Sequence, residues 1–193
     1  MPSSAILRHR ITAVRTFFSF SASSTPKPSP TSPKKPPILW KPEDPNIKDA
    51  VQLQVLSWGR GSSGQLGIGN EETRIYPTPA FSLLVPSFRL SQSPGFLSPS
   101  EPPEPALEVG ISCGLFHSAA LVDGQFWIWG KGDGGRLGFG HENPAFVPTL
   151  NPHLGNVKCL ALGGLHSVAL TTLGQVFTWS VLFAPSFVLS FFF

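Results

Sequence analysis

Two short sequence patterns recur at regular intervals in this chain, and internal repetition of this kind restricts the fold to a repeat architecture. The first pattern, a Trp-Gly pair followed by a glycine-rich run, occupies residues 58–69 and again residues 129–140. The second, a glycine turn followed by His-Ser-x-Ala-Leu, occupies residues 113–121 and again residues 162–170. A period of about 50 residues with short strands and glycine turns is typical of the blades of a β-propeller.

Each repeat has the composition of short antiparallel strands. Residues 125–129 and 175–179 are rich in β-branched and aromatic side chains, which favours half-buried strands. Asp123 and Gly124 precede the first of these runs, where a hairpin turn requires residues that tolerate a positive φ. The 21 prolines oppose long helices. We therefore expect an all-β fold.

The combined patterns resemble the regulator-of-chromosome-condensation repeat. The resemblance covers residues 51–180 and implies a seven-bladed β-propeller. Only about two to three of the seven blades are represented, so the expected fold is a partial β-propeller that follows a disordered N-terminal leader. Trp179 is followed by Ser180 instead of by a glycine-rich run, and residues 181–193 are predicted to be an aberrant apolar tail.

The resemblance implies function less firmly than fold, because propellers carry unrelated activities. The founding member of the family is an exchange factor for a small nuclear GTPase, and a mitochondrial plant member is associated with transcript splicing. We expect a non-enzymatic scaffold that binds protein or ribonucleoprotein partners in an organelle. From the resemblance to the mitochondrial member, we also expect this scaffold to support transcript splicing. The alternatives are a guanine-nucleotide exchange factor for a small GTPase and a truncated isoform without stable activity.

The first 24 residues have the features of an organellar targeting leader. Arg8, Arg10 and Arg15 accompany an apolar helical face, and no acidic residue precedes Glu43. The early arginines favour the mitochondrion, and a serine-rich run keeps the chloroplast as the alternative. The predicted domain boundaries that follow are a Pro/Ser/Lys linker at 25–45, the repeats at 46–180, a Pro/Ser-rich loop within them at 86–105, and the tail at 181–193.

Charge and hydropathy restrict the partners of the folded part. Residues 1–42 carry seven basic and no acidic residues, whereas the remaining residues carry seven basic and eleven acidic ones. The excess of basic over acidic residues therefore lies within residues 1–42, and direct nucleic-acid binding by the repeats is not supported. The apolar tail is too short to span a bilayer, so no membrane span is expected.

The glycine-rich runs also fit a dinucleotide-binding pattern, Gly-x-Gly-x-x-Gly, at residues 59–64 and 130–135. That chemistry requires a helix after the glycines to receive the pyrophosphate, and here prolines follow instead. His117 and His166 recur in register, and each is predicted to be a hydrogen-bond partner that braces a turn. We therefore expect no cofactor at these positions.

No residue set suggests a catalytic or metal site. Asp123 has no carboxylate partner, since Leu173 occupies the matching position of the next repeat. Cys113 and Cys159 lack the spacing of metal ligands and are predicted to be reduced thiols in the core. Trp127 and Trp129 are predicted to pack between blades. The sequence therefore predicts no catalytic, cofactor-binding or metal-binding residues, and a protein partner instead.

Overall fold

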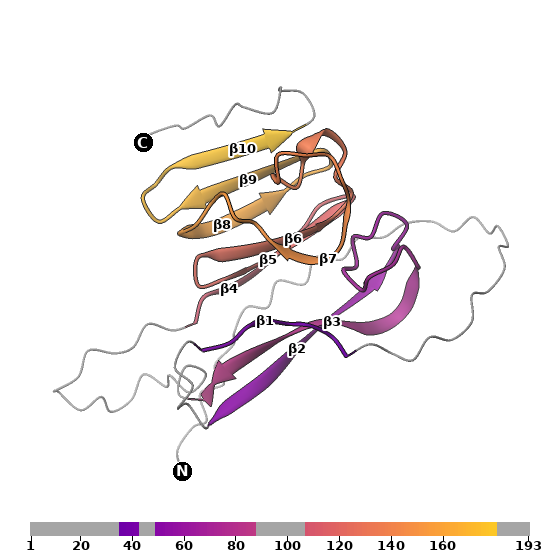
Figure 1. Ribbon diagram of the computed structural model, residues 1–193, viewed down its shortest axis with the longest axis vertical. Helices are drawn as coiled ribbons and strands as arrows, with labels where there is room; N and C mark the ends of the chain where they lie inside the picture. The colour runs from indigo at the N-terminus through magenta and orange to yellow at the C-terminus, as the bar shows by residue number, and fades with distance from the viewer. Residues whose placement is uncertain (1–34, 43–48, 88–106, 181–193) are drawn as a thin grey trace, which may run out of the picture. The chain divides into compact units, whose positions relative to one another are not determined.

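Strands make up most of the described part of the chain (Figure 1). The computed structural model describes residues 35–42, 49–87 and 107–180, and the account below concerns these residues. They belong to one unit of the structure, Lys34–Phe193. The leader, the tail and nearly all of the predicted loop at 86–105 lie outside the described residues.

The first sheet contains three strands in the order β1-β3-β2. β2 (Ala50–Gly59) and β3 (Arg74–Pro86) are antiparallel, and β1 (Ile38–Trp40) pairs with β3 in parallel. β1 falls inside the segment that was predicted to be a linker, so regular structure begins earlier in the chain than the sequence indicated. The strand is anchored by a hydrogen bond of 2.8 Å from Ser82 N to Pro37 O.

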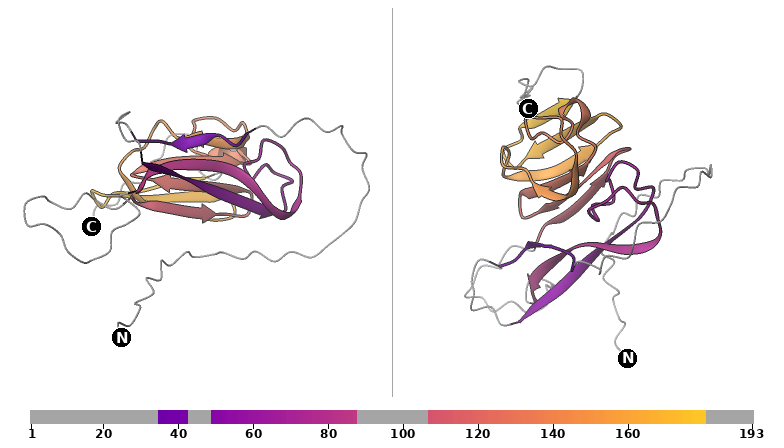
Figure 2. Two further views of the ribbon diagram at one scale, coloured as in Figure 1. Left: turned by 90° about the horizontal axis from the view of Figure 1, so that it is seen from below. Right: turned by 45° about the vertical axis from the view of Figure 1, so that its right-hand side comes forward.

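The second sheet contains four antiparallel strands in the order β4-β5-β6-β7, and the third contains three in the order β10-β9-β8. Their bounds are β4 Val109–Cys113, β5 His117–Val122, β6 Gln125–Gly130, β7 Ala145–Leu150, β8 Val157–Leu162, β9 His166–Thr171 and β10 Val176–Ser180. A short 3-10 helix, η1 (Asp133–Gly135), lies in the second glycine-rich run. Figure 2 shows the same sheets from two further directions.

The recurring sequence patterns occupy matching places in these sheets. Each His-Ser-x-Ala-Leu pattern forms the second strand of its sheet, β5 or β9, and each Trp-Gly or Trp-Ser pair ends the next strand, β6 or β10. Asp123 and Gly124 have φ angles of 46° and 78° in the turn between β5 and β6, which confirms the predicted hairpin. The sheets are successive blades, and the expected all-β partial propeller is confirmed.

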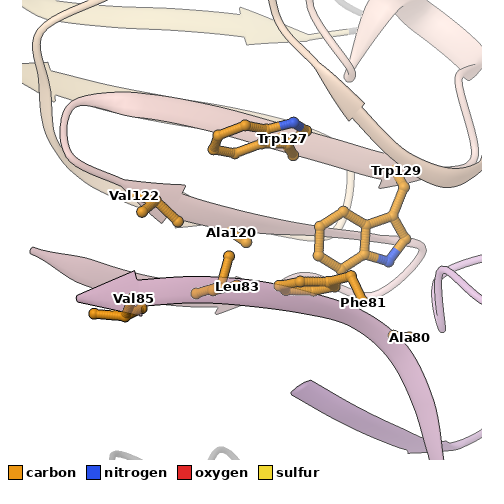
Figure 3. Packing of buried hydrophobic residues seen from close by; sticks show 8 residues of the cluster. All are labelled: Ala80, Phe81, Leu83, Val85, Ala120, Val122, Trp127 and Trp129. Carbon is orange, nitrogen blue, oxygen red and sulfur yellow. The ribbon is translucent and has the colours of Figure 1, made fainter. Parts of the chain in front are cut away.

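The core lies between neighbouring sheets because alternate residues of a strand face opposite sides. In β5 and β6, Ala120, Val122, Trp127 and Trp129 pack against the first sheet. Figure 3 shows these side chains opposite the β3 residues Phe81, Leu83 and Val85. The intervening residues of β5 and β6 pack against Val157 and Ala169 of the third sheet; they are Ala119, Leu121, Phe126 and Ile128. All of β5 is therefore buried, which explains its small side chains.

Candidate functional site

The most specific polar contacts lie at the junctions between sheets. At the junction of the second and third sheets, the backbone carbonyl of Arg136 accepts two hydrogen bonds of 2.8 Å, from Ser167 Oγ and from Trp179 Nε1. Arg136 belongs to the glycine-rich run of the second sheet, and both donors belong to strands of the third sheet. One carbonyl therefore binds two side chains of the following blade.

The junction of the first and second sheets repeats this arrangement. The carbonyl of Gln65, in the first glycine-rich run, accepts hydrogen bonds of 2.9 Å from Ser118 Oγ and from Trp129 Nε1. Gln65 and Arg136 both precede the leucine of Gly-x-Leu-Gly-x-Gly. The recurring serine, tryptophan and glycine-rich pattern is thus a device that joins one blade to the next.

The glycines of the pattern are required where the tryptophans dock. Gly67 and Gly138 both have a φ of +71°, a left-handed conformation that favours glycine. A Cβ atom on Gly67 would lie 2.7 Å from Trp129 Nε1, and one on Gly138 would lie 3.0 Å from Trp179 Nε1. Each glycine therefore provides both the backbone conformation and the space that the indole ring occupies.

His117 extends the contact at the second junction. Its Nε2 lies 2.9 Å from Ser167 Oγ, and both side chains are fully buried. Because Ser167 has one proton and donates it to the Arg136 carbonyl, His117 Nε2 is the donor to the serine oxygen. Its Nδ1 is buried without a partner among the described residues.

The surroundings of His117 keep its imidazole neutral. The pKa of His117 is lowered from 6.5 to about 4, mainly by burial and also by the nearby charges of Arg136 and His166. The spacing of the two side chains would suit a base and a nucleophile, but Ser167 is inaccessible and already donates to a carbonyl. The pair therefore has a structural role at the junction.

The two recurring histidines differ in their surroundings. His117 was predicted to brace a turn, but its ring bonds to Ser167 of the neighbouring sheet, so it braces a junction between sheets. His166 occupies the same position in the third sheet and is exposed. The turn before each histidine is closed by the backbone instead. Gly114 N donates to the His117 carbonyl at 2.8 Å, and Gly163 N donates to the His166 carbonyl at 2.9 Å.

Arg136 joins the same junction through its side chain. The guanidinium is almost completely buried, and it donates to Asp133 O at 2.9 Å and to Gly164 O at 3.1 Å. Its Cζ lies 5.7 Å from the centre of the Phe116 ring, a cation–π contact. Backbone carbonyls and an aromatic face therefore solvate this buried charge in place of a carboxylate.

The structure places the remaining candidate residues away from any reactive arrangement. The glycine-rich runs lead into strands β3 and β7, whereas a dinucleotide site would require a helix there. Trp127 and Trp129 are buried between the first two sheets, as predicted. Among the described residues, no group of three or more His, Cys, Asp or Glu side chains is placed to hold a metal ion.

The prediction that the cysteines belong to the core is wrong. Cys113 and Cys159 are free thiols, and both are exposed. They lie on β4 and β8, which are edge strands of their sheets. In the described ranges, no helix has the length and apolar character needed to cross a membrane.

Sequence reasoning missed the carbonyls of Gln65 and Arg136, because a backbone acceptor leaves no signature in its own side chain. Their position could have been found from the pattern, since each precedes Leu-Gly in a run that recurs together with serine and tryptophan. The role of Ser167 was missed for a similar reason. It was noted only as the residue after a histidine.

Two segments of the chain match a known family of repeats. Residues 54–89 and 123–170 match the regulator of chromosome condensation (RCC1) repeat. The chain is 51% identical over 180 residues, 91% of its length, to the RCC1 domain-containing protein RUG3, mitochondrial, of Arabidopsis thaliana. It is 34% identical over 129 residues, 65% of its length, to the ultraviolet-B receptor UVR8 of the same plant. The mitochondrial localisation predicted above agrees with the first relative, and we assign the chain to mitochondria.

The chain spans only part of these relatives, 39% of the first and 25% of the second. Among solved structures, human WBSCR16 is similar over 65% of this chain and 28% of its own, with a TM-score of 0.43 and 26% identity. Prp20p of Saccharomyces cerevisiae is similar over 66% of this chain and 29% of its own, with the same TM-score and 20% identity.

Proposed function

Since this chain belongs to the RCC1 repeat family, we propose that it is a non-enzymatic propeller scaffold that binds protein or ribonucleoprotein partners in mitochondria and supports transcript splicing there. One observation carries the proposal. The recurring Ser, Trp, Gly and buried His residues are used in contacts between blades, at Gln65 O and Arg136 O. The chemistry-bearing residues of the repeat thus hold neighbouring blades together, as a scaffold requires.

The mitochondrial part of the proposal rests on two independent observations. The first is the identity of 51% to a relative named as mitochondrial. The second is the leader at residues 1–24, which we propose to be the import signal because it is basic and contains no acid. The excess of acidic over basic residues after residue 42 favours a protein surface, or the protein component of a ribonucleoprotein, as the partner.

A chimera tests the splicing role. The segment of Arabidopsis RUG3 that matches this chain would be replaced by residues 46–180, and the chimera would be expressed in plants that lack RUG3. The ratio of spliced to unspliced mitochondrial transcripts is then measured. We expect the chimera to restore the ratio seen with RUG3 itself, because the two segments share half of their residues.

Two further measurements keep the result interpretable. A chimera with Trp129→Ala, which removes a buried contact between blades, should accumulate poorly and restore less splicing. A chimera that accumulates to the level of RUG3 in mitochondria and leaves splicing defective contradicts the proposal. Accelerated release of labelled GDP from a small GTPase by the purified chain would favour the exchange-factor alternative instead.

A further inference from the structure

The two glycine-rich runs contain the same backbone turn with different side chains in it. A hydrogen bond of 2.9 Å closes the turn over residues 61–64, and one of 3.0 Å closes the turn over residues 132–135. In both, the last amide N–H of the turn donates to the carbonyl of its first residue. The second residue of the turn is Ser62 in the first run and Asp133 in the second. A neutral hydroxyl therefore occupies the position at which the next repeat has a carboxylate.

Each of these residues contacts a basic residue two positions earlier. In the second run, Lys131 Nζ lies 2.7 Å from a carboxylate oxygen of Asp133, and this hydrogen bond lowers the pKa of the Asp133 carboxyl. In the first run, Arg60 Nε donates to Ser62 Oγ at 2.8 Å. Within the part of the chain that the structure describes, Arg60 forms no ion pair. The first turn therefore has the cation of the second turn but lacks its anion.

The guanidinium of Arg60 is suited to a phosphate. An arginine side chain has five N–H donors in a planar fork, and a phosphate can accept two of them at once. The Nε donor of Arg60 already reaches Ser62 Oγ, the atom to which a phosphate would be attached. A phosphorylated serine carries a charge of about −1.5 to −2 at pH 7. Such a group would supply the missing anion beside the cation.

Exposure distinguishes Ser62 from the neighbouring serines. Ser62 and Arg60 are both exposed. Ser57 is half-buried, and its hydroxyl donates to the Leu66 carbonyl at 2.7 Å. Ser63 is also half-buried. The first run therefore presents the hydroxyl of Ser62 to solvent together with the arginine that precedes it.

We propose that Ser62 is a phosphorylation site for an ATP-dependent protein kinase that recognises the arginine two residues before it. The bond between Ser62 Oγ and the γ-phosphorus of ATP forms as the bond from that phosphorus to the β–γ bridging oxygen breaks. ADP leaves, and the hydroxyl proton passes to the general base of the kinase. The phosphate then pairs with Arg60 as Asp133 pairs with Lys131. This inference does not depend on the proposed role in splicing.

Mass spectrometry of the full chain of 193 residues, expressed in plant cells and recovered with phosphatase inhibitors, tests whether the site is used. Cleavage after glutamate releases residues 44–71 as one peptide, in which the hydroxyl side chains are those of Ser57, Ser62 and Ser63. We expect tandem mass spectrometry to locate one phosphate on Ser62. The phosphate should be lost in Ser62→Ala, and the phosphorylated fraction should fall in Arg60→Gln. A peptide without phosphate, a phosphate on Ser57 or Ser63 instead, or an unchanged fraction in Arg60→Gln overturns the proposal.

A second measurement tests the pairing with Arg60 independently of any kinase. Phosphoserine is incorporated at position 62 of the full chain during synthesis, and the second pKa of its phosphate is measured by phosphorus NMR. We expect this pKa to be roughly 0.2 to 0.7 pH units lower with Arg60 than in Arg60→Gln, the shift that an exposed ion pair produces. Phosphoserine at position 63 is the matched control, and its pKa should change less in Arg60→Gln. Equal pKa values at position 62 with and without Arg60 would overturn the proposal. Circular dichroism confirms that each variant retains its strands.

Discussion

His117 Nε2 lies 2.9 Å from Ser167 Oγ, although the two residues are 50 positions apart in the sequence. The contact joins β5 of the second sheet to β9 of the third. It is continued by the bond from Ser167 to the carbonyl of Arg136, which also holds Trp179. A neutral imidazole is therefore part of the connection between two blades, and the connection depends on the charge of that ring.

Acidification should weaken the junction at His117. The pKa of His117 is lowered to about 4 from the ordinary value of 6.5, mainly by burial. Between these values the unfolded chain binds the proton and the folded chain does not, so stability is complete above pH 6.5 and is lost as the pH falls toward 4. The full difference corresponds to about 3 kcal/mol. The urea midpoint of the tryptophan fluorescence should decrease over this range.

The variant His117→Gln isolates this effect, because it retains a donor for Ser167 and does not titrate. Its midpoint should be lower than that of the unchanged chain at pH 7.5, and it should depend less on pH between 6.5 and 4.5. His153→Gln, at an exposed position, is the matched control and should retain the original pH dependence. An unchanged pH dependence in His117→Gln would show that other groups control acid stability.

The repeated residues allowed the fold to be predicted, but the hydrogen-bond partners of those residues could not be predicted from the sequence. The spacing of Trp129 and Trp179 indicated blades, and the runs of β-branched and aromatic residues indicated strands. The acceptors for the two indoles are backbone carbonyls, which no side-chain pattern reports. Cys113 was placed in the core because the sequence does not reveal that β4 is an edge strand of its sheet, whose side chains are less covered than those of the central strand β5.

The indole hydrogen bonds should contribute measurably to stability. Trp129→Phe retains an aromatic ring but removes the donor to Gln65 O. We expect the free energy of unfolding to fall by about 1 kcal/mol more than in Trp127→Phe, because one hydrogen bond is lost. Trp127 is the matched control, since it is equally buried in the same cluster and makes no hydrogen bond among the described residues. Equal losses in the two variants would indicate that packing alone holds Trp129.

Substitutions at three glycines distinguish the cost of backbone strain from the cost of filling the space that an indole ring occupies. Gly155→Ala should be nearly neutral, since the position is open and has no positive φ. Gly135→Ala should cost about 1 to 2 kcal/mol, because its φ is +68° although no atom lies nearby. Gly67→Ala combines the same strain with a Cβ only 2.7 Å from Trp129 Nε1, so it should cost about 1 to 3 kcal/mol more. Urea unfolding measures all three, and equal effects of Gly67→Ala and Gly135→Ala would refute the docking role of Gly67.

Import should depend on the arginines of the leader and not on positive charge in general. A helix over residues 5–18 would place Leu7, Ile11 and Phe18 along one side, accompanied by Arg8, Arg10 and Arg15. A mitochondrial receptor binds the apolar side, and the membrane potential draws the positive charges inward. The leader fused to a fluorescent protein should therefore enter mitochondria, and replacement of the three arginines by glutamate should leave the fusion in the cytosol.

The linker provides a control of equal charge. Replacement of Lys27, Lys34 and Lys35 by glutamate changes the net charge by the same amount. These residues follow the predicted helix, however, and lie among prolines that oppose helix formation. We expect this fusion to be imported, with fluorescence microscopy and protease protection of isolated mitochondria as the readouts. Import that fails equally in both variants would show that the net charge of the segment alone determines import. Import that survives the arginine changes would exclude the leader as the signal, and the destination would then have to be encoded after residue 24.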